Sequence, residues 1–287
     1  MVNRRYYSTR TGKNPNAAHF DLEVLKELFL NTYLSFLQRH YFQEAFGYCC
    51  VDEGVVPGTL GTDIEAEILK RLRKPLRFEP LKLSISNYTE DDLFDIMEFL
   101  FDCVSTPVDG YFHRYGNCGW HYSTFDKESG REEYRNEVNT FLVDYQDGFE
   151  LSEQGEILAL ANSGLQPLLD ANLPEYDPEN VEKRVQAAIH RFRRHHSSLD
   201  ERKNAVRDLA DVLEFLRGKA RECLLSKRDE GDLFEIANKF AIRHHNPDQK
   251  TGYNQAIWYS WMFYFYLATI HAAVRVIRES EGQSASS

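Results

Sequence analysis

A long aromatic helix near the C-terminal end constrains the fold of this chain more than any other sequence feature. From about Tyr253 to Glu279, apolar positions recur in alternating steps of four and three, the spacing of a buried helical seam: Ala256, Ser260, Phe263, Leu267, Ile270, Val274 and Ile277. A second apolar row lies beside that seam and consists of Trp258, Trp261, Phe265, Ala268 and Ala272. The two rows together predict the central helix of a bundle, surrounded by neighbouring helices.

The same helix must be weighed as a membrane span, because residues 256–274 contain no Lys, Arg, Asp or Glu and about 20 apolar residues suffice to cross a bilayer. The stretch also carries Tyr, Ser, Thr and His side chains, whose polar groups are costly in hydrocarbon. A buried helix without membrane insertion is therefore the prediction. Residues 1–33 lack the basic region and apolar run of a secretory signal, and the five cysteines are irregularly spaced, so we expect a cytoplasmic protein.

Hydrophobic periodicity predicts a mainly α protein with two domains, which suits a length of 287 residues. The N-terminal domain, 19–172, is expected to be α+β but mostly helical, and the C-terminal domain, 180–280, to be a four-helix bundle. Neither period persists between Leu168 and Asn180, which marks the boundary. Residues 1–18 and 281–287 are expected to be disordered tails.

The predicted elements of the N-terminal domain are four helices and several short strands. The helices span about 21–44, 62–72, 90–104 and 131–145, and Thr89 with Asp92 resembles a capping arrangement for the third. Alternation at 81–85 predicts a strand, and two strand-like arms flank the turn at Gly116-Asn117. A tight hairpin is predicted at 149–157.

Charge is distributed unevenly along the chain. The net charge of -11 argues against a surface that coats nucleic acid through bulk electrostatics. Residues 181–228, however, carry thirteen Lys and Arg against seven Asp and Glu. This stretch forms either a local cationic surface or a pair of solvated helix faces.

Cysteine and histidine in the N-terminal domain suggest one possible metal site. Cys103, His113, Cys118 and His121 offer the thiolate and imidazole ligands that zinc prefers. Their spacing is irregular and their neighbours are aromatic, which favours buried structural residues. The sequence therefore predicts no bound metal and no cofactor.

The cluster Arg243-His244-His245 is the candidate catalytic site. It ends a segment, 230–243, whose apolar residues recur at helical spacing, and Asn246-Pro247 stops that helix. Arginine can clamp a phosphate, and histidine titrates near neutral pH, so the cluster suits a phosphodiester substrate. The residues available to orient an imidazole are Asn238, Asn246 and Gln249.

A structural interpretation of the same cluster remains open, because cations at a helix end offset the macrodipole. The basic stretch 191–196, Arg-Phe-Arg-Arg-His-His, has the same interpretation.

The order of these elements resembles the HEPN superfamily, in which a helical bundle carries an Arg, a polar residue and a His before its last helix. The resemblance covers about Asn180 to Glu279, and the whole chain looks like abortive-infection proteins that carry such a domain at the C-terminus, preceded by a hairpin similar to residues 147–157. Arg243 and His244 match the start of the family pattern. The second His of that pattern is absent, since positions 248–250 are Asp, Gln and Lys, and His245 would have to serve instead.

The resemblance implies a metal-independent endoribonuclease that acts on cellular RNA, with tRNA among the candidate substrates. It implies that Arg243 holds charge on the phosphoryl oxygens and that His244 or His245 moves the proton. It also implies a homodimer formed through the C-terminal bundle. The alternative, from a different class, is a non-catalytic helical binding or regulatory module of a defence system.

Overall fold

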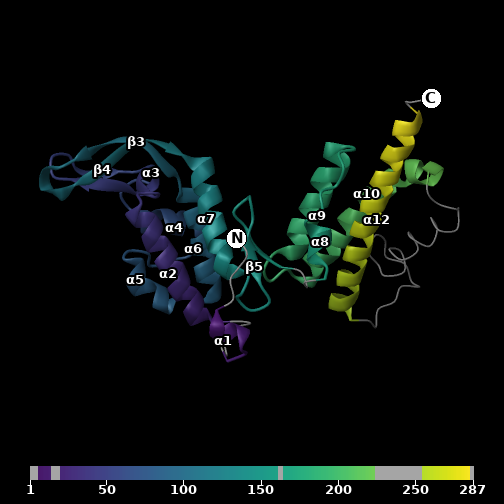
Figure 1. The fold of residues 1–287 in the computed structure, drawn as a ribbon, viewed down its shortest axis with the longest axis horizontal. Coiled ribbons are helices and arrows are strands. Elements are labelled where there is room, and N and C mark those ends of the chain that lie inside the picture. Colours follow the sequence, from purple (N-terminus) through teal and green to yellow (C-terminus); the bar gives the residue numbers. More distant parts are fainter. Residues whose placement is uncertain (1–5, 14–19, 161–163, 224–253, 285–287) are drawn as a thin grey trace. The chain divides into compact units, whose positions relative to one another are not determined.

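The computed structural model describes residues 6–13, 20–160, 164–223 and 254–284, and the protein is mainly helical, as predicted (Figure 1). It divides into two compact units, Met1–Leu160 and Ala161–Ser287. The division falls ahead of the predicted boundary at 168–180, because Leu169 already packs into the core of the second unit. Each unit has its own hydrophobic core.

Three helices supply the centre of the first core: α2 (Leu22–Gln38), α6 (Glu90–Cys103) and α7 (Lys127–Leu142). Asp21 caps α2, and Thr89 with Asp92 forms the predicted capping box of α6, in which each backbone N–H donates to the other side chain. Shorter helices complete the unit: α1 (Tyr7–Arg10), α3 (Gln43–Phe46), α4 (Ile64–Leu72) and α5 (Leu81–Ser84). Helix α1 lies within the stretch predicted to be a disordered tail.

The predicted strand at 81–85 is wrong, because this segment forms α5 and the short 3-10 helix η1 (Ile85–Asn87). Leu81 and Ile85 are buried on one helical face, whereas Leu83 is 71% exposed. The spacing of Leu81 and Ile85 by four fits both a strand and a helix, so alternation over five residues could not decide between them.

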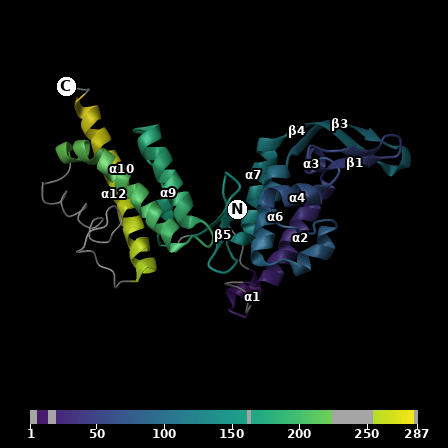
Figure 2. The same cartoon turned by 180° about the vertical axis from the view of Figure 1, so that it is seen from behind.

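The part of the first unit that the structure describes contains three antiparallel hairpins (Figures 1 and 2). They pair β1 (Gly47–Cys50) with β2 (Gly54–Pro57), β3 (Thr106–His113) with β4 (Gly119–Asp126), and β5 (Phe149–Leu151) with β6 (Ile157–Ala159). The last two pairs confirm the predicted strand arms and hairpin. The β5–β6 hairpin contributes Phe149, Leu151 and Ile157 to the main apolar cluster of the unit. No residue of β1 to β4 belongs to that cluster, and Cys50 and His121 are buried outside it.

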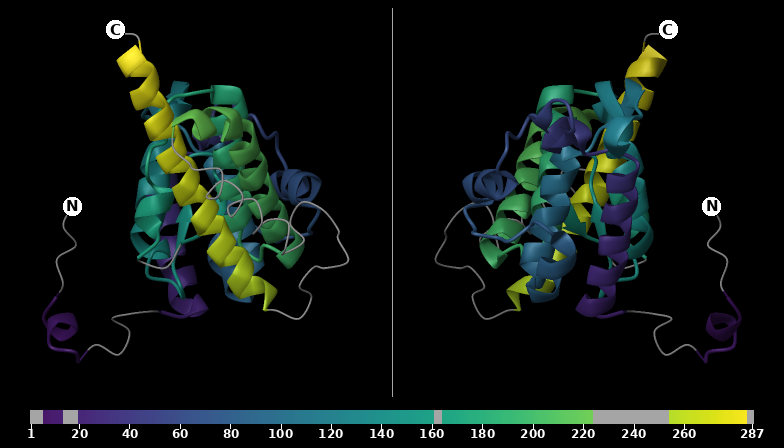
Figure 3. Two further views of the ribbon diagram at one scale, coloured as in Figure 1. Left: turned by 90° about the vertical axis from the view of Figure 1, so that its right-hand side faces the viewer. Right: turned by 90° about the vertical axis from the view of Figure 1, so that its left-hand side faces the viewer.

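The described residues of the second unit form α8 (Gln166–Leu169), the π-type turn η3 (Pro178–Glu182), α9 (Lys183–Arg193), α10 (Leu199–Cys223) and α12 (Gln255–Ser284). Helix α10 packs against both α9 and α12 (Figure 3), and the ring of Phe192 stacks on Phe263 at 3.9 Å between centroids. Helix α12 extends into 281–284, which was expected to be disordered. The predicted fourth helix, 230–243, lies outside the described residues.

The two apolar rows of α12 have different environments. Phe263, Leu267 and Ile270 of the predicted seam are fully buried. In the second row, Trp258 and Trp261 are 38% and 43% exposed. Because residues 224–253 lie outside the described residues, the expectation that neighbours surround the helix stays a prediction for this row. In the part of the chain that the structure describes, no helix combines the length and the hydropathy that crossing a membrane requires.

Candidate metal centre

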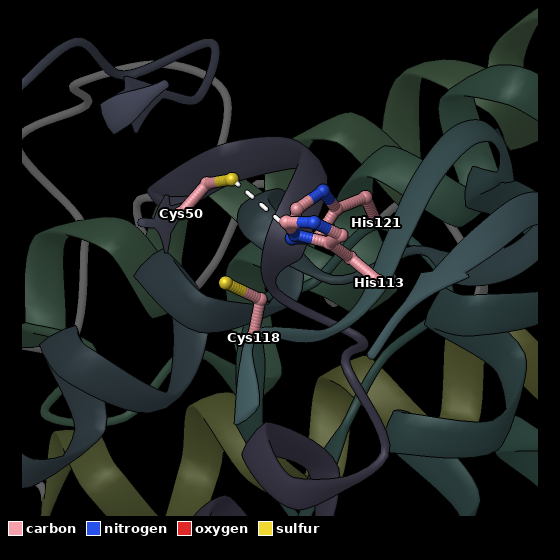
Figure 4. A group of neighbouring side chains, drawn as sticks. All are labelled: Cys50, His113, Cys118 and His121. Atoms are coloured by element: carbon pink, nitrogen blue, oxygen red, sulfur yellow. Dashed lines mark hydrogen bonds between the residues drawn. The ribbon is translucent and has the colours of Figure 1, made fainter. Parts of the chain in front are cut away.

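Four side chains of the first unit converge on one point. Cys50, His113, Cys118 and His121 each direct one ligand atom to this point, and these atoms all lie within 4.8 Å of one another. Figure 4 shows the four side chains gathered in one place, with the thiol of Cys50 directed at the ring of His113. We call this group the Cys/His centre.

Two hairpins position these residues. Cys50 is the last residue of β1 and His113 the last of β3, while Cys118 lies in the turn that joins β3 to β4, and His121 is on β4. In the register of this hairpin, Tyr111 faces His121 and His113 faces Gly119, so alternation directs both histidines to one face.

A glycine allows the β3–β4 turn to approach the end of β1 closely. Gly116 has a φ of +62°, and a Cβ placed on it would lie 2.5 Å from Val51 Cγ1. Val51 directly follows Cys50, so the β3–β4 turn packs against the end of β1. A larger residue at Gly116 would move Cys118 away from Cys50.

Cys50 and His113 have the separation expected of two metal ligands. Cys50 Sγ lies 3.6 Å from His113 Nδ1. Tetrahedral zinc, with bonds of about 2.3 Å to sulfur and about 2.05 Å to nitrogen, separates two such ligands by about 3.6 Å. The other nitrogen of His113, Nε2, lies 3.2 Å from Asp52 Oδ2. A carboxylate at this place fixes the orientation of the ring, as it does for histidines that bind metals.

His121 carries a buried nitrogen that lacks a hydrogen bond. Its side chain is 1% exposed, and Nδ1 lies 3.0 Å from Tyr111 Oη, but Nε2 has no hydrogen-bond partner among the described residues. The ring of Tyr48 stacks on His121 at 4.1 Å and holds it in place. A buried imidazole nitrogen without a partner is costly, and a bound cation would satisfy it.

Cys118 has a partner typical of a thiolate ligand. The backbone N–H of Val51 donates to Cys118 Sγ over 3.3 Å. Such N–H donors stabilise negative charge on sulfur. Both sulfurs therefore lie at the segment Cys50-Val51: Cys50 belongs to it, and Cys118 accepts a hydrogen bond from its backbone.

The structure corrects the predicted zinc ligand set at one position. His113, Cys118 and His121 meet as one group, but Cys103 ends α6 and lines a different pocket, with Arg71, Asp102 and Arg131. Burial raises the pKa of the Cys103 thiol to about 12. Cys50 occupies the fourth position, 63 residues before His113.

The predicted catalytic residues Arg243, His244 and His245 lie outside the described residues, as do Asn238, Asn246 and Gln249. The basic stretch 191–196, at the end of α9, lies within the described residues. Arg191 forms an ion pair with Asp208 of α10, and Arg193 is 8% exposed. Part of that stretch therefore joins helices within the bundle, in line with the structural interpretation.

Comparison of this chain with protein-family models, with curated proteins and with solved structures gives no match.

Proposed function

We propose that this chain is a metal-independent endoribonuclease of the HEPN type, with Arg243, His244 and His245 as its catalytic residues. The observation that carries the proposal is the order Arg-His-His a short distance before α12, the last helix of a bundle that also contains α9 and α10. The core shared by these three helices supports it, because a nuclease site of this kind needs a rigid helical frame.

In the proposed reaction the ribose 2'-hydroxyl attacks the adjacent phosphorus and the bond to the 5'-oxygen of the next nucleotide breaks. One histidine accepts the proton of the hydroxyl and the other protonates the leaving oxygen, and such proton transfers contribute about 10² to 10⁴ in rate. Arg243 holds the negative charge that develops on the phosphoryl oxygens. The products carry 2',3'-cyclic phosphate ends.

A homodimer formed through the second unit is part of the proposal. Trp258, Trp261 and Phe265 form a continuous row along α12, in which Trp261 stacks on Phe265 at 5.3 Å and stands edge-on to Trp258 at 5.4 Å. The two tryptophans are 38% and 43% exposed. Association with a second copy would cover the exposed part of Trp261 and would bring two Arg-His-His clusters to one cleft.

The second candidate function is a non-catalytic helical binding or regulatory module in a defence system. It is favoured by one specific observation: residues 248–250 are Asp, Gln and Lys, where the family pattern has its second histidine. In this case Arg243 and the histidines only end a helix and form hydrogen bonds within the fold.

Incubation of the full-length chain with total cellular RNA in Mg²⁺-free buffer tests the proposal. One arm contains free EDTA. The other contains EDTA already saturated with zinc, which cannot remove a metal ion from the Cys/His centre, and Mg²⁺ is absent from both arms. Fragments with 2',3'-cyclic phosphate ends in either arm are expected. Cleavage only after addition of Mg²⁺ or Mn²⁺ would overturn the proposal, and no cleavage in any arm would favour the binding module.

A further inference from the structure

We propose that the first unit binds one Zn²⁺ ion through Cys50, His113, Cys118 and His121. The ion would be held by both sulfurs, by Nδ1 of His113 and by Nε2 of His121. This assignment adds a site to the chain and replaces the expectation from the sequence that no metal is bound. It does not depend on the proposed nuclease, because the two functions reside in different units.

Hydrogen bonding among the four residues explains only part of the arrangement. A thiol of Cys50 that donates to His113 Nδ1 would account for the 3.6 Å distance. It would leave the buried Nε2 of His121 without a partner, at a place where all four ligand atoms lie within 4.8 Å. A cation at the centre satisfies all four atoms at once, which is why we favour it.

The ligand types select zinc among common metals. Two thiolates and two imidazoles in tetrahedral order are a preferred set for Zn²⁺, whereas Mg²⁺ and Ca²⁺ take oxygen ligands. Binding releases the two thiol protons to solvent, and the two sulfur charges then balance the two charges of the ion. The partners of the ligands are also those of a metal site, since Asp52 orients His113 and the Val51 N–H donates to Cys118.

The role of this ion is structural. Four protein ligands fill the coordination sphere and leave no open position for water or substrate. The ion would join the end of β1 to both strands of the β3–β4 hairpin, and no strand of these two hairpins belongs to the main apolar cluster of the unit. Isolated two-stranded hairpins are marginally stable. A bound metal ion would therefore stabilise these two hairpins where apolar packing contributes little.

Hydrogen bonds from α3 also hold the β3–β4 hairpin. Gln43 of α3 donates through Nε2 to the carbonyl of Trp120 over 3.0 Å and accepts from the Tyr122 N–H over 2.7 Å. These bonds fix the middle of β4 but not the end of β1. The end of β1, which carries Cys50, is therefore the segment that depends most on the metal.

Elemental analysis of the purified, untagged full-length chain after extensive dialysis tests the site. We expect about one zinc per chain in the wild type and in two matched controls, Cys49→Ser and Cys103→Ser. Cys49 is exposed and adjacent to the ligand Cys50, while Cys103 is buried elsewhere. Cys118→Ser and the double variant Cys50→Ser/Cys118→Ser are expected to lose most of the zinc.

A measurement on the wild type avoids dependence on whether the variants fold. Replacing the metal with Co²⁺ is expected to give the visible bands of a tetrahedral cobalt site and a sulfur-to-cobalt charge-transfer band, both abolished by adding zinc. Retention of no zinc by the wild type together with no tetrahedral cobalt spectrum would overturn the proposal. Equal loss of zinc from Cys49→Ser and Cys118→Ser would overturn it as well, because it would indicate nonspecific binding by thiols.

Discussion

Replacing Arg243 with alanine is expected to lower RNA cleavage by about 10² or more, with little change in the stability of the fold. The size follows from the role proposed for the guanidinium, since loss of one preorganised donor to a developing negative charge typically costs about 10² to 10³ in rate. A cation that only ends a helix contributes about 0.3 to 1 kcal/mol to stability. Rate and stability can therefore be separated by measuring cleavage and thermal unfolding on the same preparation.

Arg275→Ala is the matched control, because Arg275 is an exposed arginine on α12 and lies outside the proposed catalytic cluster. It should cleave RNA at the wild-type rate. His244→Ala and His245→Ala then test whether both histidines move protons, in which case each should lose activity. If Arg243→Ala cleaved RNA as fast as Arg275→Ala, the nuclease site would have been assigned to the wrong residues.

Removal of zinc is expected to expose the backbone of β1 to β4 to hydrogen exchange while the helical core of the first unit stays protected. With free zinc at a thousand times its dissociation constant, binding stabilises the bound state by about 4 kcal/mol, which corresponds to a roughly 10³-fold fall in protection on chelation. The effect should be local because the buried core includes residues of α2, α6 and α7 and none of β1 to β4. Hydrogen exchange with mass spectrometry, with and without chelator, measures it by segment.

Segments 93–104 and 131–142 serve as internal controls, since they contain fully buried residues such as Leu100 and Tyr134. The β5–β6 hairpin is a further control, because it is packed into the core. Residues 47–57 should lose more protection than the middle of β4, which the Gln43 side chain continues to hold. Equal loss of protection in all of these segments would show that the metal stabilises the whole unit, contrary to our account.

Local signals in the sequence were sufficient for most of the first unit. Asp21 and Thr89 are good capping residues directly before apolar helical periods, and both cap helices in the structure. The Gly116-Asn117 turn was also evident, because both residues tolerate the left-handed conformation that they adopt. The strand predicted at 81–85 was wrong because this segment has no such local signal, and a short alternating pattern does not distinguish a strand from one turn of helix.

The Cys/His centre could be predicted only in part, because it depends on long-range packing. His113, Cys118 and His121 lie close together in the sequence, and a strand pair brings them to one face. Cys50 reaches the same point through a second hairpin, and its separation of 63 residues from His113 gives no periodic signal. The sequence favoured Cys103 for the fourth position, yet Cys103 is buried at the end of α6 and lines a separate pocket with Arg71 and Asp102. Knowledge that Cys50 ends a strand beside a tight turn is the one local clue that could have favoured it.

X-ray absorption at the zinc edge tests the central structural claim most directly, because it reports which atoms surround the ion. We predict two sulfur ligands at about 2.3 Å and two nitrogen ligands at about 2.0 to 2.1 Å in the full-length protein as purified. A shell made only of nitrogen and oxygen, or a shell with more than two sulfurs, would contradict the assignment to Cys50, His113, Cys118 and His121.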